Sequence, residues 1–257
     1  MISLPNSRFL KTTLSLLLLF CIGTSLAQEN KYNGKKLLIY TKNGEGYVHE
    51  NIAASVSAIE KICKSMGVES VVSNDPEIFT DSEIMNFDAV LFSNTNNEAF
   101  ENQDQREAFQ NFCRKGKGFG GIHSAIGSER KWPWFWKLIG GSFLRHPPYQ
   151  NFTVKVSEIQ HPSTLHLKSE FDTEDECYFI KNINSDIKVL LYAELSTVSE
   201  NKNDTISFRP KNAPLSWFNT FEGGKQWYTA LGHSEELYKK PWFIKHLQGG
   251  IESILQD

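Results

Sequence analysis

Hydrophobic positions along the chain follow two different periods, and each period predicts one kind of element. Continuous apolar runs predict buried strands at residues 35–42, 68–74, 88–95 and 118–124. Between the first two runs, apolar side chains recur at helical spacing from Ile52 to Met66, and Gly67 follows as a helix terminator. A second helix is predicted over residues 104–116. Strands that alternate with helices are typical of a parallel sheet with right-handed connections.

The second half of the chain has a less regular pattern. Further strands are predicted at residues 151–158, 188–194, 215–221 and 225–232. Residues 222–224 form a hairpin turn between the last two, which adds antiparallel strands to the sheet. A closing helix is predicted from Pro241 to Leu255, and the polar segment 199–214 is expected to be an exposed loop. The sequence therefore predicts one α/β domain with a mostly parallel sheet and antiparallel additions.

Residues 1–27 have the pattern of a secretory signal peptide. Arg8 and Lys11 precede a short apolar run, and Ser25-Leu26-Ala27 follows as a small-x-small cleavage site. The run is well short of the roughly 20 apolar residues that a membrane-spanning helix needs. We therefore expect residues 28–257 to form a periplasmic or secreted domain. Lipoprotein anchoring through Cys21 is the alternative, although the preceding Phe20 fits a lipidation box poorly.

Charge and cysteine content exclude several classes of function. The formal net charge is −3, and no basic block is present, which argues against nucleic acid or an anionic membrane as a partner. Three cysteines follow the signal segment without CxxC spacing, so neither a disulfide framework nor a zinc ribbon is indicated. No GxGxxG with a following ribose-binding acid is found, so no redox cofactor is indicated.

Histidines follow three of the predicted strands. His49 comes after the first strand, His123 after the fourth and His233 after the late strand that ends in "YTALG". Ligands of parallel α/β sheets bind beyond the carboxyl ends of the strands. Imidazole titrates near neutral pH and also binds metals. We therefore predict a site that contains these three histidines, as acid/base groups or as ligands of a divalent metal. No HxH or HExxH motif supports the metal.

Glycines crowd the approach to His123 in "GKGFGGIHSA", residues 116–125. Gly121 leaves room for a sharp turn from strand into helix, which would present His123 much as a nucleophile elbow presents serine or cysteine. The alternative is that the glycines serve helix packing and that His123 satisfies a backbone group. Ser124 is not favoured as a nucleophile, because adjacent residues seldom point at one another and GxSxG is absent.

Five strings in this order resemble the ThuA-like (trehalose-utilisation) family: "GKGFGGIHSA", "HPSTLHL", "DECY", "PLSWF" and "YTALGH". The resemblance covers roughly residues 35–256. It implies a class I glutamine amidotransferase-like fold, which is a flavodoxin-like three-layer sandwich with added strands. It also implies a link to the catabolism of trehalose and of disaccharides oxidised at carbon 3. Relatives that hydrolyse glutamine carry a cysteine at the elbow, where this chain has His123, so amidotransfer is not expected.

Glu176 in "DTEDECYF" stands at the family's acidic position before an aromatic residue, where it could orient a histidine, bind a metal or act as a base. Its neighbours Glu174 and Asp175 are expected to be solvated. Arg130 and Arg145 are candidate partners for hydroxyl or carboxylate groups. Aromatic faces suit the apolar faces of sugar rings. The predicted substrate-binding set contains aromatic, small and polar residues: Gly121, Ser124, Trp134, His146, Trp217 and Tyr228.

These features predict an exported carbohydrate-processing enzyme with catalytic residues His123, His49, His233 and Glu176. A carbonyl at carbon 3 of a glucoside or disaccharide such as trehalose acidifies the proton at carbon 2. A histidine or glutamate base could then drive elimination, hydrolysis or isomerisation. A partner sugar 3-dehydrogenase would carry out the oxidation. The alternative from another class is a non-catalytic sugar-binding or accessory domain.

Overall fold

The computed structural model describes residues 1, 31–200 and 213–256. The predicted signal peptide, apart from its first residue, and most of the predicted loop 199–214 lie outside the described residues. Within the described parts of the chain, no helix is both long and apolar enough to span a membrane. Cys63, Cys113 and Cys177 are buried, as expected for Cys63 and Cys113.

One half of the central sheet is parallel and has the strand order β2-β1-β3-β4-β11. Its members are β1 (Lys36–Tyr40), β2 (Glu69–Ser73), β3 (Ala89–Ser93), β4 (Gly118–Ile122) and β11 (Gly224–Thr229). Strands β3 and β4 are buried along their whole length, because helices cover both faces of this half. All five carboxyl ends therefore meet at one edge of the sheet.

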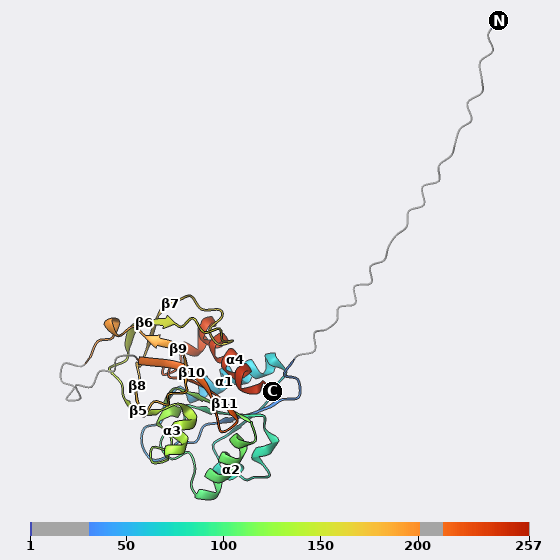
Figure 1. The fold of residues 1–257 in the computed structure, drawn as a ribbon, viewed down its shortest axis with the longest axis vertical. Helices are drawn as coiled ribbons and strands as arrows, with labels where there is room; N and C mark the ends of the chain where they lie inside the picture. The colour runs from blue at the N-terminus through green and yellow to red at the C-terminus, as the bar shows by residue number, and fades with distance from the viewer. Residues whose placement is uncertain (2–30, 201–212, 257) are drawn as a thin grey trace.

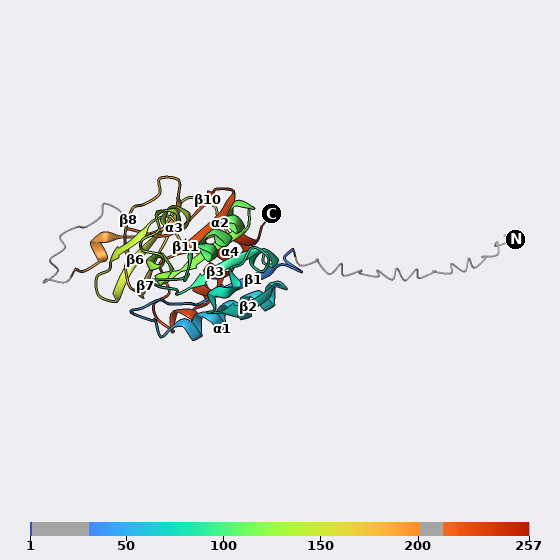
Figure 2. The same cartoon turned by 90° about the horizontal axis from the view of Figure 1, so that it is seen from below.

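Helices pack on both faces of the parallel half and complete the three layers. On one face lie α1 (Ile52–Met66) and α4 (Pro241–Leu255), and on the other lie α2 (Gln103–Arg114) and α3 (Pro133–Ile139), as Figures 1 and 2 show. Short 3-10 turns occur at Pro76–Ile78, Ile84–Asn86, His123–Gly127, Leu195–Thr197 and Leu237–Lys239. The predicted helices and strands of this half are confirmed, whereas α3 was not predicted.

The other half of the sheet is antiparallel and continues in the order β11-β10-β9-β6-β7. Its strands are β10 (Ala213–Phe221), β9 (Lys188–Ala193), β6 (Gln150–Val156) and β7 (Glu170–Asp175). A separate pair is formed by β5 (Ser142–Arg145) and β8 (Phe179–Lys181). The hairpin β10–β11 was predicted from its turn, whereas β5, β7 and β8 were not.

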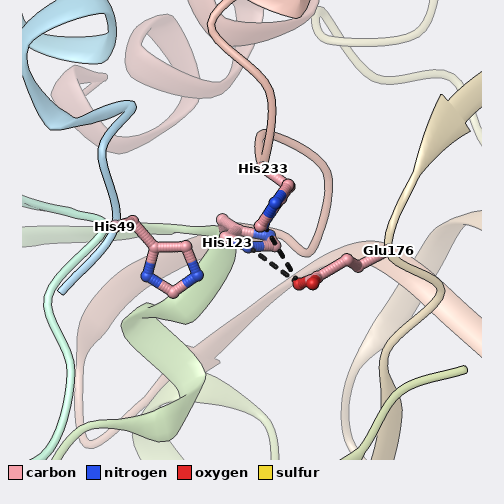
Figure 3. A group of neighbouring side chains, drawn as sticks. All are labelled: His49, His123, Glu176 and His233. Atoms are coloured by element: carbon pink, nitrogen blue, oxygen red, sulfur yellow. Dashed lines mark ion pairs between the residues drawn. The ribbon is translucent and has the colours of Figure 1, made fainter. Parts of the chain in front are cut away.

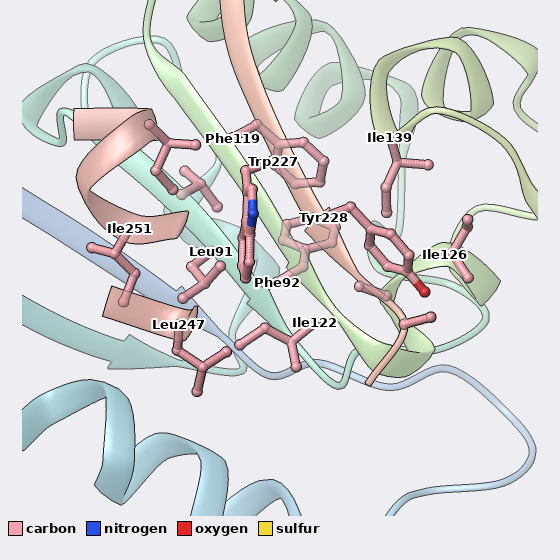
Figure 4. Packing of buried hydrophobic residues seen from close by; sticks show 14 of the residues in the cluster. Leu91, Phe92, Phe119, Ile122, Ile126, Ile139, Trp227, Tyr228, Leu247 and Ile251 are labelled. Carbon is pink, nitrogen blue, oxygen red and sulfur yellow. The ribbon is translucent and has the colours of Figure 1, made fainter. Parts of the chain in front are cut away.

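Glycines of β4 let the sheet and α4 approach closely. A Cβ atom on Gly120 would lie 2.6 Å from Leu91 Cδ1 and 3.0 Å from Ile254 Cδ1. Figure 4 shows how Leu91 packs beside Trp227 against α4. Part of the bare backbone before His123 therefore serves packing in the core, as the alternative interpretation of the sequence proposed.

His246 lies in α4 and is completely buried in this core. Its Nδ1–H donates to the backbone oxygen of Ser163 at 2.9 Å, and Nε2 lies 3.1 Å from the Thr229 hydroxyl. Burial lowers the pKa of His246 to about 3. Because an unfolded histidine takes up a proton below about pH 6.5, stability contributed here is present above that pH and is lost as the pH falls towards 3.

We predict that His246→Gln removes this part of the acid sensitivity. The wild-type protein should lose roughly 2 kcal/mol between pH 7 and pH 5 on account of His246, and the variant should lack that loss. Urea unfolding of both proteins at the two pH values measures the difference. Equal losses in the two proteins would contradict the assignment of a neutral buried imidazole.

Candidate active site

His123 stands at the turn between β4 and the following 3-10 turn. Its φ is +51°, a left-handed conformation that is uncommon for a non-glycine residue, so the turn is sharp. The Nδ1 atom lies 2.7 Å from the backbone oxygen of Ala230. Because a carbonyl only accepts, Nδ1 carries the hydrogen and Nε2 carries the lone pair. Nε2 accepts from the Tyr178 hydroxyl at 2.9 Å.

Loops after three parallel strands and the end of β7 bring four side chains together. His49 follows β1, His123 follows β4, His233 follows β11, and Glu176 follows β7. Figure 3 shows the three rings around the Glu176 carboxylate. Glu176 Oε2 lies 3.5 Å from His123 Nε2 and 3.3 Å from His233 Nδ1. One nitrogen or oxygen atom from each of the four residues lies within 4.8 Å of the others.

Electrostatics keep this cluster in a defined charge state. Burial, with the neighbouring His123 and His233, lowers the pKa of His49 to about 3, so its ring is neutral at physiological pH. Burial alone would raise the pKa of Glu176, but the neighbouring imidazoles hold it well below its usual value. The interaction with Glu176 raises the pKa of His233. A carboxylate anion thus lies among imidazole rings.

Asp175 fixes the two segments that carry Glu176 and His233. Its carboxylate is completely buried, and Oδ1 accepts from the backbone N–H of Glu176 at 2.8 Å and of His233 at 3.2 Å. Oδ2 accepts from the backbone N–H of Gly232 at 2.8 Å. The expectation that Asp175 is solvated was wrong, because β7 turns this side chain inward to backbone donors. Burial raises the pKa of Asp175, although the three N–H groups favour its charged form.

Asn51 fixes the same loop from the other side. Its Nδ2 group donates to the backbone oxygens of Gly232 and, at 2.9 Å, of His233. It also donates to Asn94 Oδ1 at 3.1 Å, in the loop after β3. Asn51 is buried and lies two residues after His49. The sequence analysis did not identify this residue, and no motif marks it.

A cavity of about 440 Å³ opens in front of the cluster. Its lining residues come mostly from the loops at the carboxyl edge of the sheet: Tyr47, His49, Asn96, Ser124, Gly127, Arg130, Phe143, His146, Glu176, Tyr178 and His233. His123 is fully buried and lies behind this lining. His146 Nδ1 lies 3.5 Å from Glu176 Oε1, so a fourth imidazole adjoins the carboxylate. The sequence analysis missed Tyr47, Asn96, Phe143 and Tyr178.

Four of the six predicted substrate-binding residues do not line this cavity. Trp217 is completely buried, and its indole N–H donates to the backbone oxygen of Ile139 at 2.8 Å. Tyr228 is also completely buried, and its hydroxyl donates to the backbone oxygen of His123 at 2.7 Å. The structure contradicts a direct role for these two side chains in sugar binding, because no ligand can reach them.

Of the other four predicted substrate-binding residues, two lie away from the cavity and two line it. Trp134 donates to Glu222 and packs against Phe221, away from the cavity. Gly121 lies inside β4, where it makes room for the side chains around it. Ser124 and His146, the other two residues of the predicted set, line the cavity.

A mixed α/β sheet with helices on both faces of its parallel half, and with a glutamate and three histidines at its carboxyl edge, defines the class of protein. It has a glutamine amidotransferase-like fold, and no cysteine is among the described residues that line the cavity. The sequence profile of the ThuA family, described as trehalose utilisation, matches residues 36–253. The chain therefore belongs to the ThuA family, which confirms the resemblance noted from the motifs.

Solved structures share this fold. A ThuA-like protein from Bacteroides uniformis superposes with a TM-score of 0.74 at 23% identity, over 87% of this chain and 92% of that one. A ThuA-like protein from Parabacteroides merdae gives a TM-score of 0.63 at 15% identity, over 86% and 90%. A cytoplasmic protein from Salmonella typhimurium gives 0.57 at 11%, over 84% and 98%. No curated protein sequence matches the chain.

Asp175→Asn tests the role of the buried carboxylate. An amide in its place directs an NH₂ group at a backbone N–H, so at least one donor loses its acceptor, at a cost of about 1–3 kcal/mol. We expect faster hydrogen exchange at the amides of Gly232 and His233, measured by NMR, and a matching loss of stability in urea. Glu174→Gln, at the exposed neighbouring position, is the control. Unchanged protection of both amides would contradict the role given to Asp175.

Proposed function

We propose that this protein is an exported carbohydrate-processing enzyme whose reaction centre is formed by His49, His123, Glu176 and His233. The observation that carries the proposal is their convergence from four loops, within 4.8 Å, behind and along one cavity. Titratable groups gathered in a cavity with shifted pKa values are typical of active sites. Membership of the ThuA family supports a carbohydrate substrate.

We further propose that the four side chains bind one divalent metal ion. Ligand atoms bound about 2.1 Å from a tetrahedral zinc ion lie roughly 3.4 Å apart. The contacts of Glu176 Oε2 with His123 and His233 measure 3.5 and 3.3 Å. The Nδ1 atoms of His49 and His233 are buried and form no hydrogen bond among the described residues. Three neutral imidazoles and one carboxylate are a donor set suited to zinc or a similar ion, which would polarise a substrate carbonyl.

The hydrogen-bond pattern fixes which nitrogen carries the hydrogen in His123 and in the adjoining His146. His123 keeps its hydrogen on Nδ1, bonded to Ala230, so Nε2, 3.5 Å from Glu176 Oε2, is the nitrogen that would bind the metal. His146 keeps its hydrogen on Nδ1, 2.8 Å from the Pro147 oxygen, which leaves Nε2 as the basic nitrogen. Because His146 lines the cavity and is partly exposed, it is the proposed proton carrier.

The proposed reaction is elimination from a 3-keto-glycoside. His146 takes the proton from carbon 2, the electron pair forms the double bond between carbons 1 and 2, and the bond from carbon 1 to the glycosidic oxygen breaks. The departing oxygen takes the proton back from His146, so no proton or electron is left over. A sugar 3-dehydrogenase would supply the oxidised substrate.

Turnover tests the proposal directly. Proton NMR of the protein with 3-keto-trehalose should show the loss of the substrate signals, and His146→Ala or Glu176→Gln should slow this loss at least about 100-fold. His166→Ala is the matched control, because His166 lies outside the cavity and bonds to the Trp242 backbone. A folded wild-type protein that binds the sugar without converting it would favour the non-catalytic sugar-binding alternative.

Metal dependence is a separate prediction. Removal of bound metal by a chelator should abolish turnover, and one equivalent of zinc or a similar divalent ion should restore it. His49→Ala should weaken zinc binding by about 10- to 100-fold or more, measured by calorimetry, since it deletes one of four donors. Full activity of protein shown by elemental analysis to be free of metal would refute the metal and leave acid/base catalysis alone.

A further inference from the structure

Arg130 and Ser124 line the same cavity as the histidine cluster but take no part in the proposed reaction. We propose that these two side chains form a subsite that binds hydroxyl groups of a neutral sugar. This inference rests on the proposed function for the class of ligand and adds the residues that hold it. Arg130 is held in place and keeps spare donors, and Ser124 has a buried hydroxyl.

Neutral groups hold the guanidinium of Arg130 in place. Nε donates to the backbone oxygen of Gly127 at 3.0 Å, and Nη2 donates to Asn96 Oδ1 at 3.2 Å. The guanidinium carbon lies 5.8 Å from the centre of the Phe143 ring. A planar group that is fixed by two hydrogen bonds and an aromatic face loses little freedom when a ligand binds.

Gly127 is required for this arrangement. A Cβ atom there would lie 2.7 Å from Asn96 Oδ1 and 3.5 Å from Arg130 Nη2, so a side chain would displace Asn96. Asn96 is fixed in turn, because its Nδ2 group donates to the backbone oxygen of Tyr47 at 3.1 Å and its Oδ1 accepts from the Asn97 N–H at 3.0 Å. The loops after β3 and β4 thus build the position of Arg130 together.

Arg130 keeps donors for a ligand. A guanidinium has five N–H donors, and the two bonds to Gly127 and Asn96 use two of them. Within the described parts of the chain, no carboxylate forms an ion pair with Arg130. Arg145, the other arginine considered in the sequence, differs because it pairs with Glu200 at 2.9 Å and does not line the cavity.

Ser124 supplies a second polar group in the same cavity. Its side chain is only 3% exposed, and its Oγ atom has no hydrogen-bond partner among the described residues. A buried hydroxyl without a partner is unfavourable, and a hydrogen bond to a ligand oxygen would remove that penalty. Ser124 directly follows His123, so a sugar bonded to Ser124 lies beside the reaction centre.

Hydroxyl groups match this subsite better than a carboxylate does. The cavity offers the Arg130 donors and the Ser124 hydroxyl, which can both donate and accept; a sugar hydroxyl also does both, whereas a carboxylate only accepts. The negative charge of Glu176 lines the same cavity and disfavours a second anion. The subsite therefore fits a neutral polyhydroxy ligand.

Calorimetric titration with trehalose, methyl glucoside and glucuronate tests the subsite without turnover. We expect Arg130→Met to weaken trehalose binding about tenfold or more, and Ser124→Ala several-fold. Arg130→Lys should be intermediate, because an ammonium donates from a single point. Lys131→Met, at the exposed next position, is the matched control, and thermal melting of each variant checks its fold.

Three results would overturn the subsite: Arg130→Met that binds trehalose like the wild type, a loss confined to glucuronate, or a wild-type protein that binds neither neutral sugar at millimolar concentration. The proposed function fails separately. Sugar binding that depends on Arg130 without any turnover would refute the proposed enzymatic function and support the subsite. Full turnover with normal KM in Arg130→Met would refute the subsite and support the enzymatic function.

Discussion

The carboxylate of Asp175 joins the two halves of the sheet at the point where the site forms. It ends β7, the outermost antiparallel strand, and accepts from backbone N–H groups just after β11, the last parallel strand. These bonds, together with those of Asn51, hold the loop of His233 beside Glu176, and the two side chains lie 3.3 Å apart. A buried carboxylate bonded to backbone donors is well suited to joining two segments, because its removal leaves several N–H groups unpaired.

The carboxyl ends of the parallel strands bring the three histidines of the site together. The parallel order β2-β1-β3-β4-β11 places the loops of His49, His123 and His233 at one edge, and the left-handed turn at His123 directs that ring behind the cavity lining. An ionised Glu176 is tolerated in this partly buried place because imidazoles adjoin it. The same closeness underlies the proposed metal site.

Much of this could be predicted from the sequence, for physical reasons. Continuous apolar runs identify strands that are buried on both faces, and residues just past such strands share one sheet edge, so the histidine trio could be found without an alignment. Strand β7 escaped prediction because its sequence EFDTED is mostly polar and its pattern is that of an exposed edge. The inward turn of Asp175 at its end has no signature in composition.

Aromatic residues show where the sequence falls short. Trp217 and Tyr228 lie on neighbouring strands of the sheet and are completely buried, although their composition suits a sugar-binding surface equally well. Strand position alone did not separate the two cases, because α3 and the pair β5–β8, which complete this part of the molecule, were not predicted. Glu176 was found through the family motif and not through periodicity, since the segment around it is acidic throughout.

The claim that four side chains act as one centre is tested most directly by anomalous diffraction from crystals of the protein grown with zinc. The account predicts one strong peak roughly 2.0–2.2 Å from a nitrogen of each of His49, His123 and His233 and from an oxygen of Glu176. An empty position between these residues, with zinc bound elsewhere or absent, would contradict it.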